Sequence, residues 1–204
     1  MEQKQVLLPV PYLSQLPDYP TGCESVSPVM VLRYYGYDIS PKTFIDRYLL
    51  CADPPLETAN GWTSRDPNQY FLGDPSSPFG WGCFPPVIAN AVEAFAPGEL
   101  TAKSLTGVSP QQLCRDYIDN HIPVLLWATA DMKQPEEEKQ ITIIGTGKKY
   151  TWRAPMHCLL LVGYTKETYL FHDPLVNGVT AYDKDEVAQA YESQGKQALA
   201  ILRK

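Results

Sequence analysis

Cys23 is the residue whose surroundings in the sequence point most clearly to chemistry. It follows a Pro-rich loop that contains Gly22, and it precedes an apolar run with helical spacing that stops at Gly36. This pattern predicts that Cys23 lies at the N-terminus of a helix. Unpaired N–H groups and the positive end of the helix dipole favour an anion there, so the thiol should ionise more easily than a free one. Cys23 is therefore a candidate nucleophile.

A nucleophilic cysteine needs a base, and the chain has three histidines. His121 falls in a turn, where a solvated histidine is the ordinary expectation. His157 and His172 lie on two predicted strands of one hairpin, and a tight turn at 165–167 brings His157 opposite Asp173, within a register step of one or two. Because side chains alternate along a strand, His172 points away from Asp173. The pair that can cooperate is therefore His157 with Asp173, in which the carboxylate orients the imidazole and the imidazole ionises Cys23.

Attack on a carbonyl also needs hydrogen-bond donors for the oxyanion. The Cys23 backbone N–H is one candidate and the Gln15 side-chain amide is the second. A lone glutamine in a loop is usually solvated, and a lone cysteine is more often a small buried hydrophobe, so the spacing leaves the catalytic and the structural alternatives both open. Glu24 would oppose thiolate formation if it were close and buried. We expect instead an acid that complements the helix dipole.

The predicted elements favour an α+β protein with helices first and an antiparallel sheet second. We expect one domain over 1–204, with a helical lobe over about 1–120, a sheet lobe over about 121–204 and a cleft between them. If the first helix starts at Cys23, Pro28 should kink it or delay its start. The other predictions are an extended edge segment over 5–12, helices over 41–50, 85–95, 109–120 and 184–193, a charged hairpin-like loop over 132–139, and strands at 123–129, 140–145, 149–153, 157–164, 168–172 and 198–202.

The stretch between residues 51 and 82 is long, rich in Pro, Gly, Asp, Ser and Asn, and also carries several aromatic residues. A loop of this length is usually a functional lid or cleft wall. A surface loop held down by its aromatic side chains is the alternative, and both stay open. If a cleft is present, Trp81 and Trp152 are candidates for its walls.

Composition narrows the classes of partner. The net charge is −6 and no basic run is present, which argues against nucleic acid and leaves polypeptides or small molecules. No apolar segment is long enough for a signal peptide or a membrane span, so we expect the chain in the cytoplasm, or secreted or at the cell surface if a signal has been trimmed. We also expect a monomer. Five widely spaced cysteines fit neither a disulfide framework nor a zinc ribbon.

Two further motifs are set aside. The segment 145–148, Gly-Thr-Gly-Lys, is too short for a phosphate loop and precedes a predicted strand, so it is interpreted as a hairpin turn. His157 and Cys158 could suggest a metal, but neighbours on a strand point to opposite faces and no carboxylate-rich cluster completes a site. We predict no metal and no cofactor.

The run Gly22-Cys-Glu-Ser-Val-Ser-Pro-Val-Met-Val-Leu-Arg-Tyr-Tyr-Gly36 resembles the signature of peptidases similar to the bacteriocin-processing, double-glycine-leader cysteine peptidases of the papain-like group. Further blocks match in the same order along nearly the whole chain: Gln15, 82–89, 122–127, 157–164, 172–174 and 195–198. The resemblance implies a papain-like two-lobed fold and a peptide or protein substrate. It implies Cys23 as nucleophile, His157 as base, Asp173 as orienting residue and Gln15 as oxyanion donor.

The chain departs from the leader peptidases proper at the nucleophile. They carry Asp-Cys-Gly where this sequence has Gly22-Cys23-Glu24, and they are fused to a transporter that is not in this sequence. Leader processing for bacteriocin export is therefore not supported. The prediction is hydrolysis of a peptide or amide bond through a Cys23 thioester. The alternatives are an acyltransferase on the same scaffold, as in the phytochelatin synthases, and a catalytically silent peptide-binding module.

Overall fold

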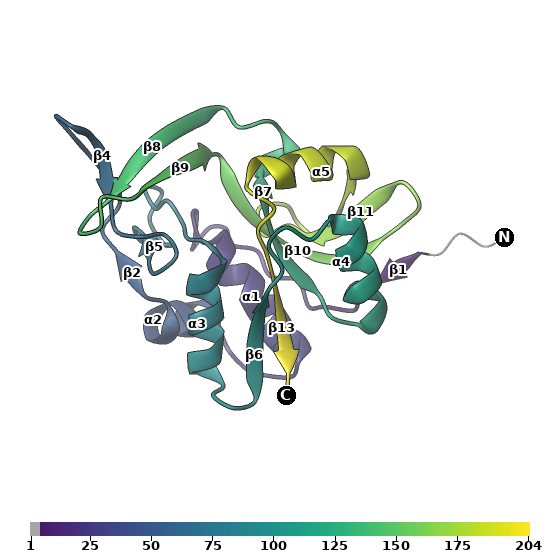
Figure 1. Cartoon of the computed structure of the whole chain (residues 1–204). Coiled ribbons are helices and arrows are strands. Elements are labelled where there is room, and N and C mark those ends of the chain that lie inside the picture. Colours follow the sequence, from purple (N-terminus) through teal and green to yellow (C-terminus); the bar gives the residue numbers. More distant parts are fainter. Residues whose placement is uncertain (1–4) are drawn as a thin grey trace.

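The computed structural model describes residues 5–204 and confirms the predicted α+β class. Within these residues, the main sheet has seven strands in the order β12-β11-β10-β7-β13-β6, with β1 paired to the end of β10 (Figure 1). All neighbouring strands of this sheet are antiparallel. The strands are β1 (Val6–Leu7), β6 (Leu100–Ser104), β7 (Val124–Thr129), β10 (Met156–Tyr164), β11 (Thr168–His172), β12 (Val179–Asp183) and β13 (Ala198–Arg203).

All the helices except the first begin where the sequence supplies a capping side chain or a proline, and the first follows Gly22 without a side-chain cap. Ser40 and Ser109 each accept a hydrogen bond from the backbone N–H three residues ahead, and a proline follows each of them at the first helical position. The Asp183 carboxylate caps the last helix in the same way. The helices are α1 (Cys23–Tyr34), α2 (Pro41–Tyr48), α3 (Pro85–Phe95), α4 (Pro110–Asp116) and α5 (Lys184–Ser193), with 3₁₀ turns at Ile118–Asn120 and Ala130–Met132.

Helix α1 packs against β10, and this contact holds together the two elements that carry the candidate nucleophile and base. The first ten residues of α1 are buried, and the Ser27 hydroxyl donates a hydrogen bond to the Cys158 carbonyl oxygen at 3.1 Å. Strand β7 is buried along its whole length between β10 and β13, and it provides Trp127, the largest fully buried side chain of the core. The helix that carries Cys23 and the strand that carries His157 are therefore packed together in the buried core.

A second, smaller sheet lies beside the first and has the order β3-β4-β8-β9 (Figure 1). Its strands are β3 (Leu56–Thr58), β4 (Gly61–Ser64), β8 (Glu137–Ile143) and β9 (Lys149–Ala154). Two further short strands, β2 (Cys51–Ala52) and β5 (Phe71–Leu72), pair in parallel. A separate hydrophobic cluster centred on Leu72, Ile141 and Trp152 supports this part of the molecule.

Several predictions need correction. Helix α1 begins at Cys23 despite Pro28, so its start is not delayed. The charged loop is shorter than predicted, because β8 already begins at Glu137. Strands β6 and β12 and the short strands within 51–82 were not predicted. Because β1 and β6 from the first half join the main sheet, a division near residue 120 does not separate helices from strands.

None of the helices in residues 5–204 combines the length and the apolar character that crossing a bilayer requires.

Candidate active site

Cys23 is the first residue of α1, as its sequence context predicts, and only 6% of it is exposed. Its thiol donates a hydrogen bond to Glu24 Oε2 over 3.1 Å. Burial raises the pKa of the Cys23 thiol well above its ordinary value, and the Glu24 carboxylate raises it further. Burial and the neighbouring carboxylate therefore oppose the lowering of the thiol pKa that the position at the helix N-terminus by itself favours.

Glu24 is not the dipole-complementing acid that we expected. It is 1% exposed, and its second oxygen accepts a hydrogen bond from the Cys83 backbone N–H at 3.1 Å. Burial raises the pKa of Glu24, although the hydrogen bonds from Cys23 and Cys83 counteract part of that effect. The carboxyl group is thus both close to the sulfur and buried, which is the arrangement that opposes thiolate formation.

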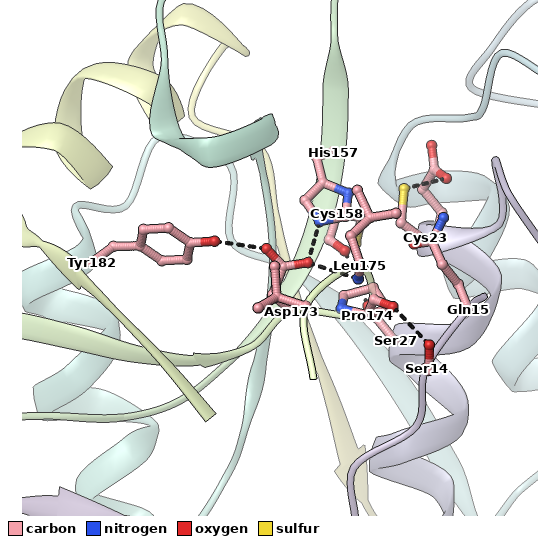
Figure 2. A network of polar contacts seen from close by, with 12 residues as sticks. Ser14, Gln15, Cys23, Ser27, His157, Cys158, Asp173, Pro174, Leu175 and Tyr182 are labelled. Atoms are coloured by element: carbon pink, nitrogen blue, oxygen red, sulfur yellow. Dashed lines mark hydrogen bonds and ion pairs between the residues drawn. The ribbon is translucent and has the colours of Figure 1, made fainter. Parts of the chain in front are cut away.

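His157 and Asp173 form a buried pair, as the hairpin argument predicts. His157 Nε2 and Asp173 Oδ1 are 2.7 Å apart, and both side chains are 2% exposed. With Nε2 turned to the carboxylate, the other ring nitrogen, Nδ1, points toward the Cys23 sulfur (Figure 2). A neutral imidazole that donates through Nε2 leaves Nδ1 free to accept a proton from that side.

Asp173 is held as a carboxylate by several donors. The Leu175 backbone N–H reaches Oδ1 at 2.9 Å and the Tyr182 hydroxyl reaches Oδ2 at 2.8 Å (Figure 2). Burial by itself raises the pKa of Asp173, but the hydrogen bonds from His157, Leu175 and Tyr182, together with the attraction of His157, outweigh it and lower the pKa. The Tyr12 hydroxyl fixes the same loop by donating to the Val176 carbonyl oxygen at 2.7 Å.

Gln15 lies in the same cavity as Cys23 and His157 and is 1% exposed. Its amide nitrogen donates to the carbonyl oxygens of Tyr19 at 3.1 Å and Pro20 at 2.9 Å, while its Oε1 is buried without a hydrogen-bond partner. The amide is therefore fixed beside the nucleophile. Its N–H groups are engaged by the loop that precedes α1.

The other two histidines lie elsewhere. His121 is an exposed residue after the 3₁₀ turn, as predicted. His172 is buried and packs edge-on against Tyr12, with ring centroids 5.5 Å apart. Burial lowers the pKa of His172. Among residues 5–204, no cluster of three or more His, Cys, Asp or Glu side chains could hold a metal ion.

A cavity of about 350 Å³ opens onto Cys23 and His157. Trp81 and Trp152 form part of its wall, as predicted, with ring centroids 5.5 Å apart. Glu137 and Lys139 of β8 also line the cavity and form an ion pair, and the Lys139 ammonium lies 5.2 Å from the centroid of Trp62. Because Trp81 belongs to the stretch between 51 and 82, this part of the stretch is a cleft wall.

Comparison with known proteins gives the family. The Peptidase_C39 like family matches residues 7–199. The chain belongs to this family. The match to the Peptidase_C39 like family takes in α1 with Cys23 and the hairpin that carries His157 and Asp173.

Two individual proteins resemble this family member, one in sequence and one in structure. The uncharacterized protein YvpB of Bacillus subtilis (strain 168) is 27% identical over 194 residues, which are 89% of this chain and 69% of YvpB. A crystal structure from Bacillus anthracis, provisionally described as a C39-like peptidase, superposes with a TM-score of 0.85 at 23% identity and covers 98% of each chain. The second likeness shows that the fold is shared.

Sequence reasoning missed two participants in the site of this Peptidase_C39 like family member. Tyr182 was not considered because β12 was not predicted, although the alternation Val-Thr-Ala-Tyr-Asp at 179–183 is a strand signal. Glu24 was considered but placed wrongly. No local signal could have revealed its burial, since its partner Cys83 lies 59 residues away in sequence.

Proposed function

We propose that this protein is a cysteine peptidase or amidase in which Cys23 is the nucleophile, His157 the base and Asp173 the positioning residue. The observation that carries the proposal is the His157–Asp173 pair, whose free nitrogen points toward a buried cysteine at a helix N-terminus (Figure 2). Family membership and the adjoining cleft support it. We also interpret α1 packed on β10 as the interface between the two lobes of a papain-like fold.

The first chemical step is acylation of Cys23. The thiol proton passes to His157 Nδ1, and the sulfur forms a bond to the substrate carbonyl carbon while the carbonyl π electrons move to oxygen. The imidazolium stays paired with Asp173 and then gives its proton to the leaving nitrogen as the C–N bond breaks. The product of this step is a thioester on Cys23 and a free amine.

The second step is hydrolysis of the thioester. His157 accepts a proton from water, the hydroxide oxygen attacks the thioester carbon, and the C–S bond breaks to give a carboxylic acid. The sulfur recovers its proton from His157. Because burial raises the pKa of the Cys23 thiol, transfer of its proton to His157 is the energetically unfavourable part of the acylation step.

The oxyanion of both steps needs donors. We propose the Cys23 backbone N–H, one of the first-turn groups that have no partner within their own helix, and the Gln15 amide. The Gln15 amide nitrogen currently donates to Tyr19 and Pro20, so this role requires it to release one of those carbonyls when a substrate carbonyl enters. Its position in the cavity beside Cys23 supports the assignment.

The substrate class we propose is a peptide that lies across the cleft with an apolar side chain against Trp81 and Trp152. These two rings and Met156 give the cavity wall next to Cys23 an apolar character. The charged pair Glu137 and Lys139 lines the same cavity. A peptide that presents both an apolar and a polar side chain to the cavity fits this lining.

The test is hydrolysis of a synthetic peptide library, read by mass spectrometry, together with alkylation of Cys23 by iodoacetamide. Cys23→Ala and His157→Ala should each abolish cleavage while the melting temperature stays within error of the wild type. Cys51→Ala is the matched control, because Cys51 is an exposed cysteine beside a different cavity. Retained cleavage in Cys23→Ala would refute the proposal, and so would equal loss in Cys51→Ala.

A further inference from the structure

The Glu24 carboxyl group lies directly beside the sulfur of Cys23. The two groups share a hydrogen bond of 3.1 Å, drawn from the Cys23 sulfur in Figure 2, and both residues are buried. A buried carboxylate next to a thiol disfavours the thiolate, because two negative charges would then meet in a medium of low dielectric constant. A cysteine nucleophile with such a neighbour needs a means of removing that charge.

Residues distant in sequence fix the carboxyl group in this place. The Cys83 backbone N–H donates to Glu24 Oε1 at 3.1 Å. Gly82 lies against the same oxygen, and a Cβ built there would come within 2.2 Å of Oε1. Gly82 also has φ +127°, a conformation that favours glycine. The chain thus reserves space for this carboxyl group with a residue that has no side chain.

The titratable groups around Glu24 are the thiols of Cys23, Cys83 and Cys158 and the imidazole of His157. Asp173 lies on the other side of His157. Burial raises the pKa values of Cys83 and Cys158 well above the ordinary thiol value, so both stay neutral. The charge state around the sulfur therefore depends on how protons are distributed among Cys23, Glu24 and His157.

We propose that Glu24 is a further catalytic residue, which donates a hydrogen bond to the Cys23 thiolate when its carboxyl group is protonated and restrains the thiol when it is ionised. This inference rests on the proposed function of Cys23. The existing hydrogen bond simply reverses: in the restrained form the S–H donates to Oε2, and in the active form the O–H donates to the sulfur. No atom other than the protons has to move.

Counting protons gives the pH dependence. The active arrangement holds two protons on the three groups, one on the Glu24 carboxyl and one on His157, with Cys23 as the thiolate. Loss of one proton leaves the thiol donating to the Glu24 carboxylate with His157 neutral, which is the restrained form. Gain of a third proton converts the thiolate to a thiol. Reactivity should therefore follow a bell-shaped curve whose alkaline limb belongs to the coupled group and not to His157 alone.

The experiment compares the rate of Cys23 alkylation by iodoacetamide between pH 4 and pH 10 in the full chain and in Glu24→Gln. The glutamine oxygen can still accept from Cys83 N–H, and its NH₂ group donates permanently to the sulfur. The variant should keep the acid limb and move the alkaline limb upward by a unit or more, so that alkylation on the alkaline side is about tenfold faster than in the wild type. Glu186→Gln, which removes an exposed acid from the first turn of α5, is the matched control and should leave the curve unchanged.

A second measurement on the wild type does not depend on how the variant folds. Asp173 and Glu24 are the buried acids among residues 5–204, and the pKa of Asp173 is lowered by its hydrogen bonds despite burial. An infrared C=O band of a protonated buried carboxyl near neutral pH would therefore come from Glu24. The inference requires this band to disappear over the same pH range as the alkaline limb of alkylation.

The outcomes separate the two proposals. Alkylation curves that superimpose in the wild type and Glu24→Gln would overturn the role of Glu24 and leave Cys23 as nucleophile. Loss of alkylation at every pH in a folded Glu24→Gln protein would also overturn it, because the carboxylate itself would then be required. If Cys23 of the folded wild type resists alkylation at every pH, the proposed function fails as well.

Discussion

Tyr182→Phe removes a single hydroxyl oxygen, which contacts Asp173 on the carboxylate oxygen that does not bind His157. The Tyr182 hydroxyl donates to Asp173 Oδ2 at 2.8 Å, and Asp173 is 1% exposed. A hydrogen bond to a charged group contributes about 1.5–3 kcal/mol to stability. Because Tyr182 is only half-buried and water can approach the vacated position, we expect the lower end, about 1.5 kcal/mol. For a chain of this length, that loss corresponds to a fall of about 3–6 °C in melting temperature.

The loss should depend on pH, because the same hydrogen bond helps to lower the pKa of Asp173 against the effect of burial. A carboxylate with a lowered pKa in the folded state stabilises the protein above its unfolded pKa, and this stabilisation disappears as the pH falls through the folded value. The difference between wild type and Tyr182→Phe should therefore be largest near pH 7 and should shrink as the pH falls below about 4.

Urea unfolding at neutral pH and at the lowest pH at which both proteins fold would measure this difference. Tyr37→Phe is the control, because the Tyr37 hydroxyl donates to the exposed Glu99 carboxylate at 2.9 Å, the same chemistry at the surface. It should leave the midpoint within error. The reasoning is refuted if Tyr182→Phe and Tyr37→Phe behave alike, or if the Tyr182→Phe loss is the same at both pH values.

Three further changes test other parts of the structure. Gly163→Ala places a Cβ 2.1 Å from the Val6 carbonyl oxygen, so it should cost about 1–3 kcal/mol and speed hydrogen exchange at the β1–β10 pairing; an unchanged melting temperature would contradict it. When the pH falls from 7 to 5, the free energy of unfolding of His172→Gln should decrease less than that of the wild type, because burial lowers the pKa of His172 and its imidazole is protonated first in the unfolded chain. Alkylation of Cys23 should persist in this variant, and parallel plots of unfolding free energy against pH would argue against the reasoning. Trp81→Ala should raise KM for cleaved peptides about tenfold with a smaller effect on kcat, and an unaltered KM would remove this ring from the binding wall.

Local patterns predicted the elements that carry the candidate site. The start of α1 at Cys23, the serine caps and prolines of α2 and α4, and the bounds of α5 all follow from signals within a few residues. The hairpin of β10 and β11 was predictable because its turn is short, and a short turn fixes which residues face each other. That register was enough to choose His157 over the other two histidines.

The strands that were missed depend on partners far away in the chain. Strand β4 pairs in parallel with β8, and β6 finds its partner in β13, about a hundred residues later. These strands are short, and their sequences alone do not distinguish them from loops. It is the pairing with a distant strand that makes them part of a sheet. For this reason the sequence identified the stretch between 51 and 82 as a long loop with many aromatic residues, but did not show that part of it belongs to a second sheet.

The sequence by itself determined that Cys23 begins a helix, that His157 and Asp173 share one face of a hairpin, and that the chain resembles a peptidase family. Only the tertiary structure decided the electrostatics around the sulfur. Glu24 is buried because the Cys83 N–H and the bare backbone of Gly82 make room for its carboxyl group, and that desolvation raises the pKa of the neighbouring thiol. Helix starts are set by nearest neighbours in the chain, whereas burial and dielectric environment are set by neighbours in space.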